Sequence, residues 1–169
     1  MDEEEVWSIL RNALDTALEM LVETRTAEGV NLKKDMIEKL DALKAGVERI
    51  ETRYPEILAA YENRLKEKIA DILGDNQIDE SRIAAEVVLF ADKLATDEET
   101  VRLKSHIDSM KKELEKGTDI GRKLDFIAQE MNREANTILS KANDLETSNI
   151  AIDLKTGIEK IREQVQNIA

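Results

Sequence analysis

Apolar side chains recur every three or four residues along most of the chain, and this spacing predicts amphipathic helices. The first such pattern runs from Leu10 to Tyr54 and keeps its register across Gly29, which predicts one continuous helix. Pro55 predicts the end of that helix, because the residue before a proline avoids helical backbone angles. A second helix from Pro55 to about Leu73 then completes a long antiparallel helical hairpin.

Signals for helix starts divide the rest of the chain into four further helices. Residues 74–76 predict a turn, after which Asp79 is a candidate N-cap. Thr96 followed three residues later by Glu99 resembles a capping box, in which the two side chains satisfy backbone groups at the helix start. The last helix carries a regular apolar stripe to the end of the chain.

The segment Gly121–Lys141 satisfies two helical patterns at once. One is an apolar stripe that is expected to face a core, made up of Ile120, Leu124, Ile127, Met131, Ala135 and Ile138. The other is a polar stripe about a third of a turn away, made up of Asp125, Gln129, Asn132, Asn136, Ser140 and Asn143. Asn and Ser are poor helix formers, so the polar stripe is expected either to pack against another helix or to bind a ligand.

Composition supports an all-α protein with two parts. With 41% hydrophobic and 37% charged residues, six Gly, one Pro and few aromatics, the 169-residue chain has little material for strands or turns. We predict a hairpin arm over residues 1–74 and a compact helical bundle over residues 75–169. The absence of Cys excludes disulfides and thiolate metal sites, and it fits a cytoplasmic protein.

The formal net charge of −12 argues against a large nucleic-acid surface, although it leaves room for a local basic patch. No apolar run is long enough to span a membrane, and the N-terminus lacks the order of a signal peptide, so no membrane association is expected. No zinc motif, phosphate-binding loop or nucleophile elbow is present. Any chemistry must therefore come from individual polar side chains on the helices.

The single histidine, His106, is the first candidate for chemistry. It lies four residues after Arg102 and seven after Glu99, so the three side chains project from nearly the same side of one helix. A histidine near a carboxylate can act as a general acid, a general base or a metal ligand, and it can equally be a half-buried structural residue. Asp92, at the end of the preceding helix, is expected either to reach the same place or to be solvated.

Two further charge pairs have helical spacing. Glu130 and Glu134 form an i, i+4 carboxylate pair, which can grip one divalent ion, share one basic partner or simply be solvated. Arg25 and Glu28 fall within the apolar arc of the first helix, where a charge needs a partner or a use. They are interpreted either as a buried ion pair or as functional residues.

Several segments resemble a known family. AEVVLFADK, VRLKSHI, GRKLDFIAQEMNREANTILSK and IEKIREQVQNI resemble the C-terminal part of the YicC-like (YicC/YloC) bacterial proteins. In the long first helix, TRTAEG is similar to that family's motif of an arginine followed by Glu-Gly, with Thr24 where the family more often has Met. The resemblance covers essentially the whole chain and is strongest from Ala85 onward.

The resemblance implies an endoribonuclease that requires a divalent metal, Mn²⁺ or Mg²⁺, and that assembles as a hexamer. It also implies an N-terminal domain of comparable size, so this chain is expected to be a C-terminal fragment in which Met1 replaces that domain. Taken with residue types, the resemblance assigns catalysis to His106, Glu99, Arg102 and Arg133, metal binding to Asp92, Glu130 and Glu134, and RNA binding to Arg25, Glu28, Gln129, Asn132 and Asn136.

Two other functions remain open from the sequence. The chain can be a helical oligomerisation module without catalysis, in which the polar stripe and the Arg25 and Glu28 pair make contacts between copies. It can also be an adaptor that binds RNA without cleaving it. RNA and further copies of the chain are therefore the expected partners.

Overall fold

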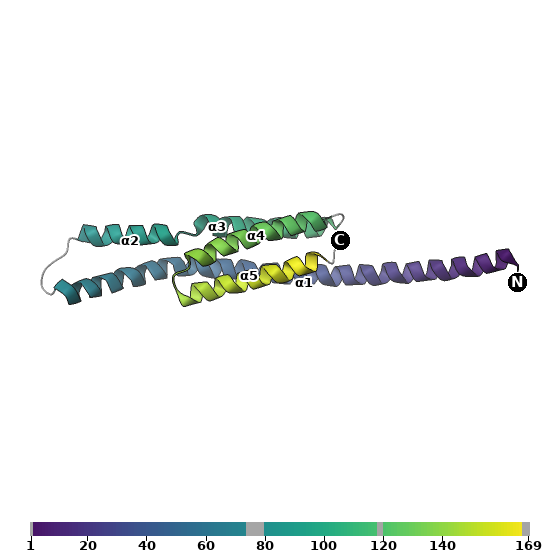
Figure 1. The fold of residues 1–169 in the computed structure, drawn as a ribbon, viewed down its shortest axis with the longest axis horizontal. Coiled ribbons are helices and arrows are strands. Elements are labelled where there is room, and N and C mark those ends of the chain that lie inside the picture. Colours follow the sequence, from purple (N-terminus) through teal and green to yellow (C-terminus); the bar gives the residue numbers. More distant parts are fainter. Residues whose placement is uncertain (1, 74–79, 118–119, 167–169) are drawn as a thin grey trace.

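The computed structural model describes residues 2–73, 80–117 and 120–166, and this part of the chain is all-α, as predicted (Figure 1). It contains five helices and no strand: α1 (Glu3–Leu73), α2 (Glu80–Leu94), α3 (Asp97–Lys116), α4 (Gly121–Lys141) and α5 (Leu145–Val165). None of these helices is long and apolar enough to cross a membrane.

The predicted helix end at Pro55 is wrong, because α1 continues through it for 71 residues. Pro55 has no N–H to bond the carbonyl of Glu51, and an interior proline costs about 3 kcal/mol. Contacts made by the two residues before the proline hold the backbone helical. The Tyr54 hydroxyl donates a hydrogen bond to the carbonyl of Ala91 in α2 at 2.9 Å, and Arg53 pairs with the start of α5.

The predicted hairpin, formed by a helix from Leu10 to Tyr54 and a second from Pro55 to about Leu73, is therefore absent. Instead, the last part of α1 pairs with α2, which runs alongside it (Figure 1). The rings of Tyr61 and Phe90 stack there with centroids 3.7 Å apart. No residue of α2 is buried, so this pairing is a peripheral one.

The hydrophobic core lies between the middle of α1 and the helices α3, α4 and α5. α4 contributes the predicted apolar stripe, whose members are all buried: Ile120, Leu124, Ile127, Met131, Ala135 and Ile138. α1 contributes Met36, Leu40, Leu43, Val47 and Ile50. The core thus crosses the predicted division at residue 74.

Two glycines set the close approach of α1 and α5. A Cβ atom added to Gly157 would lie 2.8 Å from Cδ2 of Leu43, and one added to Gly46 would lie 3.0 Å from Cδ2 of Leu154. Each glycine therefore accommodates a leucine of the opposite helix. Larger residues at these positions would push the two helices apart.

The first part of α1, residues 3–31, extends past the bundle as a free arm (Figure 1). Its helix continues across Gly29, as predicted, and nearly every side chain on it is exposed. Arg25 and Glu28 are exposed and form no ion pair with any described residue, so the predicted buried pair is wrong. The apolar arc does continue past them, but no other helix in the described part of the chain covers it.

Helix starts follow local chemistry only in part. Thr96 occupies the N-cap position of α3, yet its side chain makes no capping hydrogen bond, so the predicted capping box is not formed. Asp79 and the turn at 74–76 lie outside the described residues. α5 has a cap that the sequence analysis missed: the Asp144 carboxylate accepts hydrogen bonds from the backbone N–H groups of Glu146 and Thr147.

Candidate functional site

α3 and α4 run antiparallel, and the edge where they meet carries a row of charged side chains. We call this row the charged edge; it consists of Glu99, Arg102, His106 and Glu113 on α3 and of Lys123, Glu130, Glu134 and Lys141 on α4. Helical spacing places the four residues of each helix within an arc of about 60°. Ion pairs across the edge fix which residues face one another.

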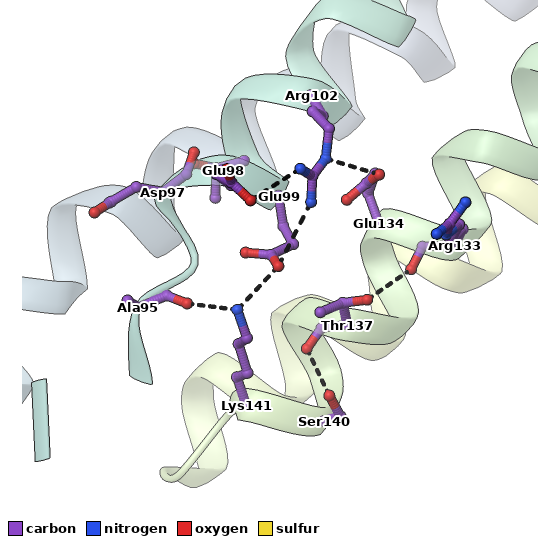
Figure 2. Close-up of polar contacts among 11 residues, drawn as sticks. Ala95, Asp97, Glu98, Glu99, Arg102, Arg133, Glu134, Thr137, Ser140 and Lys141 are labelled. Carbon is purple, nitrogen blue, oxygen red and sulfur yellow. Dashed lines mark hydrogen bonds and ion pairs between the residues drawn. The ribbon is translucent and has the colours of Figure 1, made fainter. Parts of the chain in front are cut away.

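Arg102 is the central cation of the charged edge. Its Nε atom lies 3.0 Å from Oε1 of Glu134, Nη1 lies 3.0 Å from Oε2 of Glu98, and Nη2 lies 3.6 Å from Oε1 of Glu99 (Figure 2). The hydrogen bonds that Arg102 donates to Glu134 and Glu98 raise the pKa of its guanidinium group. Arg102 therefore stays charged and ties α3 to α4.

Glu99 is buried, with 6% of its surface exposed, and Lys141 is its main partner. Lys141 Nζ lies 2.9 Å from Oε1 of Glu99 and donates a second hydrogen bond to the carbonyl of Ala95 at 2.8 Å (Figure 2). Burial raises the pKa of the Glu99 carboxyl, but hydrogen bonds from Lys141 and from its own backbone N–H, together with the charges of Lys141 and Arg102, outweigh burial and lower the pKa overall. Oε2 of Glu99 is buried without a hydrogen-bond partner.

His106 and Glu130 occupy the middle of the charged edge. They lie between the Arg102 and Glu134 contact and the contact of Glu113 with Lys123, which is 2.7 Å long. The same antiparallel register therefore makes Glu130 the residue of α4 opposite His106. Both side chains are half-buried, and within the described residues neither forms a hydrogen bond or an ion pair.

The structure brings together only part of the predicted site. Glu99, Arg102, His106, Glu130 and Glu134 share the charged edge, whereas Asp92 is exposed on α2 and Arg133 is exposed on α4 without an ion pair to any described residue. Asp92 lies near α1 instead, where it and Asp97 add to burial in raising the pKa of Tyr54.

The predicted metal ligands Asp92, Glu130 and Glu134 are not grouped around one point in the described part of the chain. Within the described residues, no three His, Asp or Glu side chains are placed so that they could hold one ion together. Glu134 instead pairs with Arg102, and Asp92 is an exposed residue of another helix, α2. The donor set that the resemblance implied therefore does not fit a divalent ion with these residues alone.

The predicted RNA-binding residues divide into three groups. The amide of Asn132 donates to Oε1 of Glu159 in α5 at 3.1 Å, which supports packing between helices. Gln129 donates to Asp125 one turn away, and Asn136 is exposed without a hydrogen bond in the described part of the chain. The remaining two, Arg25 and Glu28, do not reach the charged edge. The end of α3 pairs with α1 through Lys111 and Asp41, and Arg25 is about 24 Å along α1 from Asp41 at 1.5 Å per residue.

Residues 50–169 match the family model described as endoribonuclease YicC-like, C-terminal. The chain belongs to this family. It is similar to a protein named probable endoribonuclease YicC from Clostridioides difficile strain 630, with 45% identity over 168 residues. It is also similar to a protein of the same name from Haemophilus influenzae, with 33% identity over 159 residues.

The alignments cover almost all of this chain, 99% and 94%, but only 57% and 55% of the two relatives. The chain therefore spans little more than half the length of these YicC proteins. The part that matches the YicC-like model contains the whole charged edge, whereas the free arm of α1 precedes it.

Sequence reasoning missed two cations that organise this YicC-like bundle. Lys141 was given no role from the sequence, although it binds both Glu99 and the carbonyl of Ala95, just after α2. Arg53 was not singled out, yet it contacts Asp144 at 2.9 Å and Glu146 at 2.6 Å and so joins α1 to α5. In each case the cation has its own spacing on one helix, but the partner is on another, so a single-helix pattern does not reveal the pair.

The carboxyl groups in these ion pairs have lowered pKa values, which predict that acid destabilises the fold. The pKa of Glu113 is lowered by Lys116 and Lys123, that of Asp125 by Arg162, and that of Glu99 as described above. A lowered folded-state pKa means that the stabilisation is fully present above the ordinary values, 3.8 for Asp and 4.5 for Glu, and is lost as the pH falls through the lowered values. The thermal midpoint is therefore expected to fall steeply below about pH 4.5.

Measurement of the thermal midpoint at a series of pH values tests this, with Glu99→Gln as the informative variant. Gln keeps the shape of Glu99 but cannot titrate, so the variant should lose less stability over the acid range. Glu163→Gln is the matched control, because Glu163 is exposed and forms no ion pair with a described residue. An acid profile for Glu99→Gln identical to that of the unmodified chain would contradict the prediction.

Proposed function

We propose that this chain forms the C-terminal helical part of a cytoplasmic endoribonuclease that hydrolyses phosphodiester bonds in RNA. The observation that carries the proposal is the family match over residues 50–169, together with two relatives that are both named probable endoribonuclease. The charged edge lies entirely within the matched residues. We therefore assign the reaction to this edge.

His106 and Glu130 are the pair that we assign to proton transfer. Hydrolysis requires a base that takes a proton from the attacking water and an acid that gives one to the leaving oxygen. Other carboxylates on the charged edge are neutralised by lysine or arginine. His106 and Glu130 are half-buried, lie at opposite positions of the helix register, and form no hydrogen bond or ion pair with a described residue. Arg102, on the neighbouring turn, supplies positive charge for the phosphate.

A divalent metal, Mn²⁺ or Mg²⁺, belongs to the proposal because the family resemblance implies one. This chain gathers no donor set for it in its described part, so the ion would need ligands beyond those present here. We route no step of the reaction through the ion. The residues of the charged edge would position the RNA and move protons beside it.

The direct test is to incubate the purified chain with end-labelled RNA, with and without Mn²⁺ or Mg²⁺, and to separate the products on a gel. Internal cleavage that disappears on chelation is the expected result. Intact RNA under all conditions, while a longer family member cleaves the same RNA, would remove catalysis by this chain alone. Salt-dependent binding without cleavage by either protein would favour the adaptor function.

The free arm of α1 favours a second candidate function, assembly with further copies of the chain. Its exposed apolar stripe, which we call the arm stripe, consists of Trp7, Leu10, Leu14, Leu18 and Leu21, with exposed fractions of 48 to 67%. These residues lie within an arc of about 80° on the same side of α1 that the bundle buries further along. Exposed apolar surface of this extent is typical of a protein interface.

Charge along the arm disfavours a parallel pair of arms. The first turn carries Glu3, Glu4 and Glu5, and a parallel arrangement would place these acidic turns side by side, whereas an antiparallel one separates them. The hexamer that the resemblance implies would contain several such pairs.

Leu14→Glu is expected to reduce the oligomer to a smaller species, because it places a charge at the centre of the arm stripe. Size-exclusion chromatography with light scattering measures the change. Ile9→Glu is the matched control, since Ile9 is 61% exposed on the other side of the arm. Equal masses for the unmodified chain and Leu14→Glu would rule out the arm stripe as the interface.

A further inference from the structure

The side of α4 that faces away from the bundle carries an unusual row of exposed residues, which we call the outer stripe. It consists of Arg122, Phe126, Gln129, Arg133, Asn136 and Ser140, all of them exposed. At 100° per residue these positions fall within an arc of about 80°, opposite the buried face centred on Met131. The outer stripe is therefore free of contacts with the core of this chain.

Phe126 is the first unexpected residue of the outer stripe. Its side chain is 62% exposed, whereas Phe90, the other phenylalanine, is half-buried against the ring of Tyr61. A solvated helix surface is normally formed by charged and amide side chains. An exposed ring at the middle of the stripe is therefore a contact surface that no described residue of this chain covers.

The charge of the outer stripe is the second observation. None of its six positions is acidic, although the chain has 37 acidic residues and a net charge of −12. The exposed surface of α5, by contrast, includes Glu146, Asp153, Glu159 and Glu163. Among the described residues Arg133 and Arg122 form no ion pair, whereas Arg102, Lys123 and Lys141 on the charged edge all do.

We propose that the outer stripe of α4 binds single-stranded RNA, with a base stacked on Phe126 and phosphates held by Arg122 and Arg133. An exposed aromatic ring beside unpaired guanidinium groups is the combination that binds unpaired nucleotides. Gln129 and Asn136 supply amide groups for sugar or base hydrogen bonds. This inference rests on the proposed function, and it adds the class of RNA and the surface that receives it.

Single-stranded RNA fits the outer stripe better than a duplex does. In a duplex the bases are stacked on one another, so their faces are closed to a protein ring. The two arginines lie eleven residues apart, which is about 16 Å along α4 and corresponds to about five phosphates of a stacked strand. The stripe is therefore long enough for a short run of nucleotides with Phe126 between its ends.

Fluorescence anisotropy with the full chain and a short fluorescein-labelled oligouridylate tests the proposal. Phe126→Ala is expected to weaken binding between about 5-fold and 150-fold, the range for loss of one stacked base. Phe126→Tyr keeps the ring and should bind like the unmodified chain, whereas Phe126→Leu keeps only apolar bulk and should bind like Phe126→Ala. Ile152→Ala is the control, because Ile152 is also an exposed apolar residue, at 49%, but lies on α5.

The arginines have a separate expected signature. Arg133→Gln should reduce the slope of log affinity against log salt by about 0.7, the value for one phosphate contact on a single strand. The same sequence annealed to its complement should bind more weakly than the single strand. Equal affinity for the duplex, no binding by the unmodified chain, or a change in oligomer mass on Phe126→Ala would each overturn the proposal, the last by making a second copy the occupant.

Cleavage measured on the same variants separates this inference from the proposed function. Binding that depends on Phe126 without any RNA cleavage would keep the outer stripe and remove the nuclease activity. Cleavage by a chain whose binding does not respond to Phe126→Ala would keep the activity and remove the stripe. Circular dichroism and the thermal midpoint confirm that each variant is folded, which is expected because Phe126 lies outside the core.

Discussion

Replacing His106 with alanine is expected to slow RNA cleavage by about 100-fold or more, within the range of about 10² to 10⁴ that one acid or base contributes. The reason is its position in the charged edge, half-buried and opposite Glu130, between contacts that fix α3 against α4. RNA affinity should change far less than the rate, because phosphate contacts come from arginine. Single-turnover cleavage with the enzyme in excess measures the rate of the chemical step.

The double variant that combines His106→Ala with Glu130→Gln tests whether the two residues act together. If His106 and Glu130 act as one proton-transfer unit, the double variant should be about as slow as the slower single variant. If the double variant were slowed by the product of the two single rate reductions, the two side chains would act separately. Ser105→Ala, an exposed neighbour of His106, is the matched control, and full cleavage by His106→Ala would remove our assignment.

Replacing Gly157 with leucine is expected to lower the free energy of unfolding by about 2 to 3 kcal/mol, the upper part of the range for overpacking a core. Even the Cβ atom of the new residue would lie 2.8 Å from Cδ2 of Leu43, which is itself buried. Either Leu43 must leave its rotamer or α5 must move away from α1. Urea denaturation followed by circular dichroism measures the loss.

Glycine substitutions in the same helices provide a matched pair of controls. Gly29→Ala has open space around the new methyl group and should gain up to about 1 kcal/mol from better helix propensity. Gly157→Ala has the same propensity gain but meets Leu43, so the difference between the two variants isolates the packing cost. Equal stability changes at both positions would show that α1 and α5 do not depend on this close approach.

The sequence predicted the core of α4 well, because apolar residues at helical spacing lie on a single face of the helix and that face packs against the neighbouring helices. A residue such as Met131 is buried wherever the helix packs, whichever helix lies opposite. The pattern also correctly placed Glu99 and Arg102 on one side of α3. It did not identify Glu134 and Lys141 as their partners, because the register between two helices depends on how their connection folds.

At Pro55 and at Arg25, the local sequence pattern led to a wrong prediction. At Pro55, backbone preference predicted a helix end, but contacts of Arg53 and Tyr54 with α5 and α2 override that preference. At Arg25, the apolar arc predicted burial, but an arc is buried only where another element covers it. Both outcomes depend on residues distant in sequence, which single-helix periodicity does not contain.

The uninterrupted α1 has a mechanical consequence. At 1.5 Å per residue its 71 residues span about 107 Å, and the hydrophobic core packs only against its middle. A continuous helix held in this way fixes the direction in which each end points and the distance of that end from the bundle. Inserting one residue between the arm and the bundle would swing the arm stripe by about 100°, whereas inserting seven would return it to within about 20°. The number of residues between the arm stripe and the bundle therefore determines the direction in which the arm presents its apolar side.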